Sequence, residues 1–171
     1  MILNIIAFQL AWLALVIGAA NGLPYIGLPV VVATIMLHLV RSPQTLPEVK
    51  LLLAATAVGF VAESAFLAVG LVRYVELTSI SWLPPAWLVM LWPAFATLLN
   101  VTFRPFREWV VAAVIFGFAF APLAYYAGAK LGAMTMPDPV IRSLSIIGVA
   151  WAVALPLLLT LAFRWDGWKD A

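Results

Sequence analysis

One carboxylate lies inside a stretch of the chain that otherwise avoids charge. Glu63 is part of FVAESAFLAVG, residues 60–70, where most neighbours are Leu, Ala, Val or Gly. An acid in an apolar helix faces a bundle interior or a hydrated cavity, because exposure to lipid is costly. Such an acid is a candidate site for a ligand, a substrate or a proton. Any chemistry of this chain is therefore expected around Glu63.

The depth of Glu63 along its helix selects five candidate partners. At about 1.5 Å of rise per residue, it lies roughly 10–13 Å below the outer end of an apolar helix over 49–71. Two interpretations stay open. In one, a structural hydrogen bond or an ion pair with Arg142 fixes helix register; in the other, these groups form a ligand site that opens to the outer side. Four candidate partners lie near this depth: Trp92, Tyr125, Tyr126 and Ser145. The fifth, Arg142, lies nearer the outer end of 140–163, and its long side chain could reach down to Glu63.

A second polar group is expected nearer the inner end of the same bundle. Gln9, His38 and Asn100 are placed there by the same helical rise and are interpreted as a structural layer, separate from Glu63. Catalysis is less favoured, because no other apolar stretch holds the second acid of a two-carboxylate mechanism. A nucleophilic Ser64 would need a base, and His38 lies toward the opposite end. The enzymatic alternative stays open without being preferred.

Composition excludes several other kinds of site. The chain has no cysteine, which rules out disulfides, thiolate metal sites and cysteine nucleophiles. A single histidine rules out a His-rich metal centre or a bis-histidine haem, and no metal or other cofactor is expected. The net charge is +2 and the basic residues are scattered, so a nucleic-acid partner is not expected. Membrane lipids are the expected partners.

The elements that position these residues are expected to lie in a membrane. The 171 residues are 66% hydrophobic and 9% charged, and their mean hydropathy is +1.13. A soluble domain is about a quarter charged, and a chain of this length could not bury so much apolar surface in water. The sequence therefore predicts an integral membrane protein.

Six stretches are long enough to cross a bilayer as helices, which takes about 20 apolar residues. The first has no Lys or Arg before it, unlike a signal peptide, and is expected to be retained. Residues 1–171 are thus expected to form a single all-α domain, an integral membrane bundle of six transmembrane helices. The expected spans are 3–20, 24–40, 49–71, 85–102, 109–130 and 140–163.

The distribution of basic residues predicts the orientation of this bundle. Six of them fall on the side that holds both termini, and Arg73, Lys130 and Arg142 fall on the other. Because the cytoplasmic side carries the excess of Lys and Arg, both the N-terminus and the C-terminus are expected in the cytoplasm, with the protein in a bacterial inner membrane. The six are Arg41, Lys50, Arg104, Arg107, Arg164 and Lys169.

Small and aromatic residues inside the spans have two possible roles. Small residues recur along one face of 109–130, which lets helices approach closely in lipid. Trp12, Trp92 and Trp151 lie far from the interfaces, so they either pack in a core or line an aromatic cavity. Pro122 and Pro156 remove backbone hydrogen bonds within helices, and kinks there would help to open such a cavity. The small residues are Gly117, Ala121, Ala124, Gly128 and Gly132.

Several stretches of the chain together carry a resemblance. They are FQLAW at 8–12, GAANG at 18–22, ES at 63–64, PAWLVMLWPAFATLLN at 85–100 and PLAYYAGAKLGA at 122–133. Over nearly its whole length the chain resembles a family of small polytopic bacterial inner-membrane proteins catalogued as a domain of unknown function. The resemblance implies a compact membrane protein and, since genes for such proteins tend to lie near genes for lipid-modifying methyltransferases, a lipid-related role. It implies no established activity and no catalytic residue.

The preferred function is binding or handling of a lipid-like or small amphipathic molecule in an outer-half cavity around Glu63. A solute-binding subunit of a transporter is the first alternative and predicts an outward-open polar pocket. A membrane-embedded lipid-modifying enzyme predicts a second reactive group beside Glu63. A structural subunit of a membrane complex predicts a filled core. Assembly into a homo-oligomer, or with a membrane-protein partner, stays open.

Overall fold

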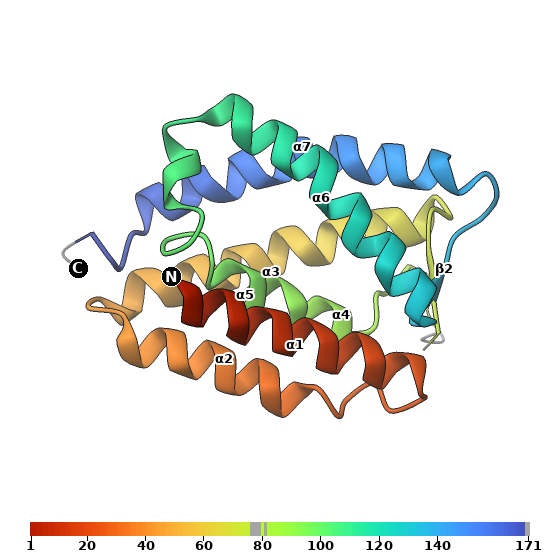
Figure 1. Ribbon diagram of the computed structural model, residues 1–171, viewed down its shortest axis with the longest axis horizontal. Coiled ribbons are helices and arrows are strands. Elements are labelled where there is room, and N and C mark those ends of the chain that lie inside the picture. The colour runs from red at the N-terminus through yellow and green to blue at the C-terminus, as the bar shows by residue number, and fades with distance from the viewer. Residues whose placement is uncertain (76–79, 81, 170–171) are drawn as a thin grey trace.

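The fold is a bundle in which successive helical segments run in opposite directions along the long axis (Figure 1). The computed structural model describes residues 1–75, 80 and 82–169. A short 3-10 helix, η1 (Arg104–Arg107), and a pair of two-residue strands join the helices. The helices are α1 (Ile2–Ala20), α2 (Leu28–Arg41), α3 (Thr45–Ala68), α4 (Ala86–Val89), α5 (Leu91–Ala96), α6 (Val110–Leu131) and α7 (Val140–Arg164).

Four helices are long and apolar enough to cross a membrane: α1, α3, α6 and α7. They indicate a membrane protein, as the composition does. The spans expected over 24–40 and 85–102 are shorter than predicted. α2 has 14 residues, which is about 21 Å of helix against about 30 Å of hydrocarbon. Six full-length spans are therefore not confirmed.

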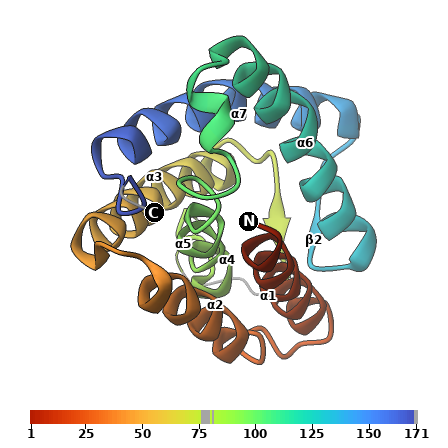
Figure 2. The same cartoon turned by 60° about the vertical axis from the view of Figure 1, so that its left-hand side comes forward.

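The chain around α4 and α5 shows why the span over 85–102 breaks up. Pro93 has no backbone N–H to donate within α5. The Thr97 hydroxyl donates to the Ala94 carbonyl at 2.7 Å and so competes with the helical pattern. The Leu98 carbonyl then accepts the N–H groups of both Thr102 and Phe103 in a tight turn. In Figure 2, α4 and α5 lie at the centre of the bundle with the longer helices around them.

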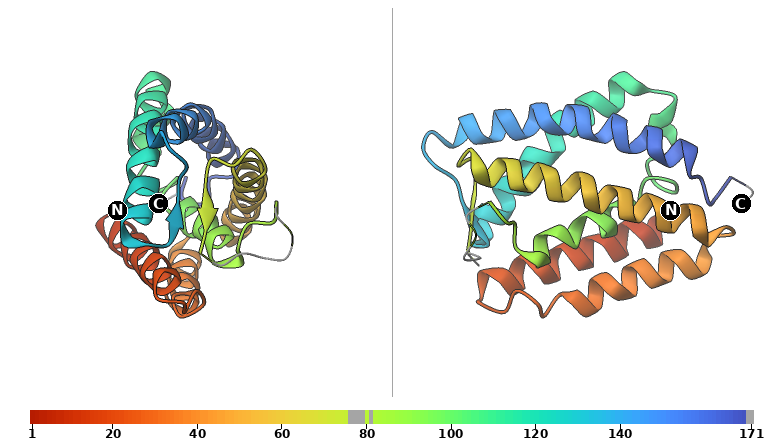
Figure 3. Two further views of the ribbon diagram at one scale, coloured as in Figure 1. Left: turned by 90° about the vertical axis from the view of Figure 1, so that its right-hand side faces the viewer. Right: turned by 180° about the vertical axis from the view of Figure 1, so that it is seen from behind.

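The N-terminus and the last described residues of the chain lie toward the same end of the bundle (Figure 3, right). The α2–α3 connection and η1 lie at that end as well, here called the inner end. The opposite, outer end holds the α1–α2 turn, the strands and the α6–α7 connection. This alternation agrees with the expected order of crossings.

A small antiparallel ladder closes the outer end, where the sequence predicted no strand. β1 (Arg73–Tyr74) follows α3, and β2 (Met134–Thr135) follows α6. Their register pairs Arg73 with Thr135 and Tyr74 with Met134. The ladder therefore ties the chain after α3 to the chain after α6.

Glycines allow the central aromatic residues to pack against helix backbones. A Cβ on Gly59 would lie 2.1 Å from the Trp92 ring, and one on Gly117 would lie 2.4 Å from the Trp151 carbonyl oxygen. Because these contacts are impossible for a larger residue, both positions require glycine. Trp92 and Trp151 stack with their ring centroids 4.7 Å apart. This stack lies between α3, α5, α6 and α7.

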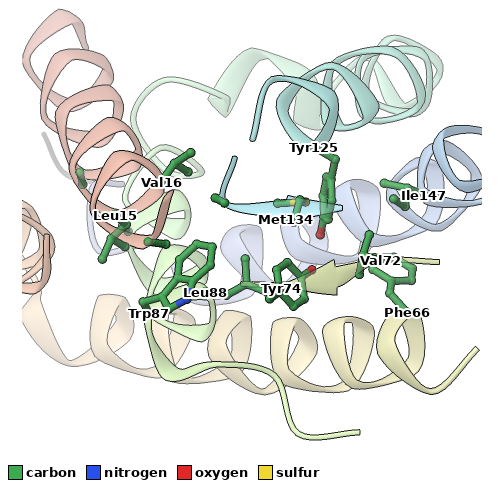
Figure 4. Close-up of a cluster of buried hydrophobic side chains, with 14 of the residues drawn as sticks. Leu15, Val16, Phe66, Val72, Tyr74, Trp87, Leu88, Tyr125, Met134 and Ile147 are labelled. Atoms are coloured by element: carbon green, nitrogen blue, oxygen red, sulfur yellow. The ribbon is translucent and has the colours of Figure 1, made fainter. Parts of the chain in front are cut away.

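Buried hydrophobic side chains pack together in the outer part of the bundle (Figure 4). Trp87 and Val72 are completely buried, and Tyr74 packs edge-on against Trp87 with ring centroids 5.9 Å apart. Figure 4 shows the hydroxyl groups of Tyr74 and Tyr125 pointing toward each other from β1 and α6. Two phenols thus meet inside an otherwise apolar cluster.

Candidate functional site

Glu63 accepts three hydrogen bonds from side chains on three different elements. The Tyr74 hydroxyl donates to Glu63 Oε2 at 2.6 Å. The Trp92 indole donates to Oε1 at 3.2 Å, and the Tyr125 hydroxyl donates to the same oxygen. Glu63 is 1% exposed. The acid therefore lies inside the bundle with both of its oxygens hydrogen-bonded, as expected for a buried charged or polar group.

Local structure explains how each donor reaches the acid. Gly59 lies one helical turn before Glu63 on α3 and leaves room for the Trp92 ring. Tyr125 packs edge-on against Phe66, with ring centroids 6.1 Å apart. Tyr74 is held by its pairing with Met134. Three side chains from different segments of the chain thus converge on one carboxylate.

The Tyr74 phenol remains a donor across the physiological pH range. Burial raises the pKa of Tyr74 well above its usual range, and the nearby Glu63 carboxylate raises this pKa further. A phenol that keeps its proton can donate to the carboxylate. Tyr74 is therefore the donor in this hydrogen bond at neutral pH.

The prediction that Glu63 faces the interior with a polar partner is confirmed, with Trp92 and Tyr125 among those partners. Tyr126, Arg142 and Ser145 are wrong as partners. All three are exposed, and Tyr126 instead lies against Lys130, whose ammonium is 5.2 Å from the ring centroid. Successive residues of a helix are rotated by about 100° about its axis. Residues at the same depth can therefore lie on different faces of their helices.

Tyr74 is the partner that the sequence analysis missed. It follows the predicted span, in a connection, and nothing in the local pattern directs its side chain back into the bundle. The pairing of β1 with β2 does so. A two-residue ladder between segments about 60 positions apart has no periodic signal from which it could be predicted.

A cavity of about 530 Å³ lies beside this carboxylate. Glu63, Trp92 and Tyr125 form part of its wall, and the lining is otherwise predominantly apolar. Both expected roles of the three central tryptophans are met: Trp12, Trp92 and Trp151 line this cavity, and they also pack in or against the buried core. The volume of the cavity is within the range of small-molecule sites, about 300–1,000 Å³.

The cavity has an open side between α1 and α6. Four of its lining residues are exposed, and they define the mouth: Gln9 on α1, and Phe120, Leu123 and Ala124 on α6. Phe120 is 55% exposed and Leu123 59%. These residues lie near the middle of two helices that are long enough to span a membrane. The mouth therefore lies at mid-helix, on the side of the bundle.

The outer end of the cavity is covered. Met134 forms part of its wall, and this residue is 5% exposed while its partner Tyr74 is 2% exposed. Leu71 and Val72, just before β1, are also buried. The expectation of a site that opens to the outer aqueous side is therefore not met; the opening is lateral.

A second polar network occupies the inner end. His38 Nε2 and Glu48 Oε2 lie 2.7 Å apart, within hydrogen-bond distance. Asn100 donates to Glu48 Oε1, and His38 Nδ1 lies 3.0 Å from Asn4 Nδ2. The separate inner layer is thus confirmed for His38 and Asn100. Gln9, the third member predicted, is at the mouth of the cavity instead.

The segment after α7 closes over this inner network. The Gly167 N–H donates to Glu48 Oε1 at 2.8 Å. Asp166 pairs with Arg107 at 2.8 Å and with Arg104 at 3.0 Å. The sequence analysis assigned Glu48 to a connection, but α3 begins at Thr45 and Glu48 is completely buried in its first turn. These contacts join the segment after α7 to α3 and η1 in a structural network.

The part of the chain that the structure describes contains no preformed metal site. No group of three His, Asp or Glu side chains is placed there to bind an ion. Glu48 and Glu63 are on the same helix, 15 residues apart in the printed sequence, which is about 22 Å. The two carboxylates therefore belong to separate sites.

Comparison with known proteins identifies a family. The family model described as a protein of unknown function (DUF2878) matches residues 1–157. The chain belongs to this family. No curated protein and no solved structure gives a significant match. The DUF2878 assignment confirms the resemblance found in the sequence, and the function has to be argued from the cavity.

Proposed function

We propose that this DUF2878 protein binds or handles a lipid-like, amphipathic molecule in the cavity beside Glu63. The molecule would reach the site from the bilayer, between α1 and α6. In this proposal all six helical segments cross or enter the membrane, and both termini face the cytoplasm of a bacterium. The excess of basic residues at the inner end supports that orientation.

The observation that carries the proposal is the position of the mouth. A cavity that opens at mid-helix is reached by molecules dissolved in the hydrocarbon, not by water-soluble ones. The wall is apolar along most of its length, whereas Glu63, Trp92 and Tyr125 make one part of it polar. A mostly apolar cavity with a few convergent polar groups matches an amphipathic ligand.

The three alternative functions are less well supported. A solute-binding transporter subunit requires an outward-open polar pocket, but β1 and β2 cover the outer end. An enzyme requires a second reactive group beside Glu63, and its described neighbours are hydrogen-bond donors already engaged with it. A purely structural subunit requires a filled core, which a cavity of about 530 Å³ contradicts.

Native mass spectrometry of protein extracted in mild detergent tests this function. Ala121 lines the cavity on α6, whereas Ala119 on the same helix is exposed and outside the lining. Ala121→Phe fills the cavity, and Ala119→Phe adds the same bulk to the lipid-facing side. We expect a bound amphipathic molecule on the wild type and on Ala119→Phe, and its loss from Ala121→Phe. Equal retention by both variants, or no binding to the wild type even after long-chain lipids are added, would contradict the proposal.

A further inference from the structure

The polar part of the cavity has unused hydrogen-bonding capacity of both kinds. Tyr125 and Trp92 each donate their one polar hydrogen to Glu63. After that, the phenol oxygen of Tyr125 can still accept, and so can the carboxylate, which has about four lone-pair positions. Among the described residues, one donor, Tyr74, faces Glu63 Oε2. The Glu63 cluster therefore presents acceptors to the cavity.

Another residue of the cavity wall supplies a donor. The indole Nε1 atom of Trp87 is buried, and no described residue accepts a hydrogen bond from it. Trp87 lines the cavity. A buried N–H group without an acceptor is costly. Beside a cavity, such a group favours a ligand atom that accepts from it.

The shape of the cavity limits the apolar part of the ligand. Its α6 wall extends from Phe116 to Gly128, a length of about 18 Å along the helix. Phe103 and Phe116 lie at the inner end of this wall, and Met134 lies at the outer end. A single hydrocarbon chain that lies along the bundle axis matches this elongated form, with its polar end beside Glu63.

We infer, on the basis of the proposed function, that the ligand is a single-chain lipid whose polar end carries a hydroxyl group. A hydroxyl donates one hydrogen and accepts others, so it can donate to Glu63 or Tyr125 and accept from an indole. A carboxylate or phosphate only accepts and would leave the acceptors of the Glu63 cluster without a donor. A protonated amine only donates and would leave the Trp87 N–H group without an acceptor. Long-chain alcohols and monoacylglycerols have the required chemistry.

Binding of three chains that differ only at the head group tests this inference. The probes are hexadecanol, hexadecanoic acid and hexadecyl phosphate, measured by competition on the purified protein in detergent. Since one good hydrogen bond is worth about a factor of ten, hexadecanol is expected to bind about tenfold tighter than the two anions. Equal or tighter binding of either anion would overturn the hydroxyl assignment while leaving the proposed function intact. Failure of all three chains to bind would instead contradict the proposed function.

A pair of neighbouring tyrosines supplies a matched control. Tyr125→Phe keeps the ring and removes the hydroxyl that faces the cavity, so it should reduce the advantage of hexadecanol over hexadecanoic acid. Tyr126→Phe makes the same change on an exposed side chain outside the lining and should leave the preference unchanged. A preference that survives Tyr125→Phe, in protein that unfolds at the wild-type temperature, would contradict the assignment of the head group to this end of the cavity.

Discussion

At the scale of residues, the account depends on three donors that share one acceptor. Tyr74, Trp92 and Tyr125 all bring a polar hydrogen into a buried apolar environment, and Glu63 accepts from each of them. Trp92 can only donate, whereas a phenol can donate or accept. Trp92 and Tyr125 donate to the same oxygen of Glu63, so position 63 must offer an acceptor to both of them. Toward Tyr74, the residue at position 63 can either accept or donate.

Glu63→Leu and Glu63→Gln separate the need for an acceptor from the need for a charge. Leucine leaves three buried donors without an acceptor, each at about 1–3 kcal/mol, so a loss of about 3 kcal/mol or more is expected. Glutamine can direct its oxygen to Trp92 and Tyr125 and its amide group to the Tyr74 oxygen, so a loss of about 1 kcal/mol or less is expected. Thermal unfolding in detergent measures both. Equal stability of the two variants would show that the donors do not depend on position 63.

The sequence correctly predicted the depth of Trp92 and Tyr125 along their helices. It did not predict correctly which candidate side chains point into the bundle. The helical rise alone placed Trp92 and Tyr125 level with Glu63, and that placement is confirmed by their contacts. The sequence analysis also selected Arg142 and Ser145, which are on the exposed face of α7, while Ser143 between them is buried. In a membrane span both faces are apolar, so the sequence carries little amphipathic signal that distinguishes inside from outside.

At the scale of elements, close packing of α3 against α5 positions the site. Gly59 faces the ring of Trp92, which stacks on Trp151 of α7. The long helices were predictable from their hydropathy. The short ones were not, because Pro93 and Thr97 interrupt the helical pattern through specific backbone contacts.

Gly59→Ala is expected to destabilise the protein and to displace Trp92 from Glu63. Its Cβ would lie 2.1 Å from the Trp92 ring, and overpacking of this kind typically costs about 1–3 kcal/mol. Ala65→Leu adds more bulk to an exposed position of the same helix and should be close to neutral. The unfolding temperature and the tryptophan emission spectrum report the two effects. A Gly59→Ala protein with wild-type values of both would contradict the packing described for α3 and α5.

At the scale of the whole molecule, the two ends of the bundle are built differently. The inner end is joined by polar contacts among Asn4, His38, Glu48 and Asn100, and the segment after α7 covers them. The outer end is closed by a two-residue ladder and buried apolar side chains. The sequence indicated separate polar layers but could not reveal how distant segments close over them.

Reporter fusions test the orientation of this bundle. Fusions after residue 45, after residue 105 and at the C-terminus are expected to report the cytoplasm, because the basic residues concentrate at that end. A fusion near residue 78, which lies outside the described residues, is expected to report the opposite side. A cytoplasmic signal near residue 78 would contradict the alternation of the helices and the position assigned to the ladder.

Photolabelling from within a bound chain tests the central claim most directly, namely that the cavity takes a lipid chain from the bilayer. A long-chain alcohol and the matching acid, each with a diazirine in mid-chain, would be added to the protein in lipid nanodiscs and the adducts mapped by mass spectrometry. We expect adducts concentrated on cavity residues such as Phe116, Ala121 and Trp151, and their loss in Ala121→Phe but not in Ala119→Phe. Adducts spread over outward-facing residues such as Val111, Val153 and Phe163, unchanged by Ala121→Phe, would contradict the account.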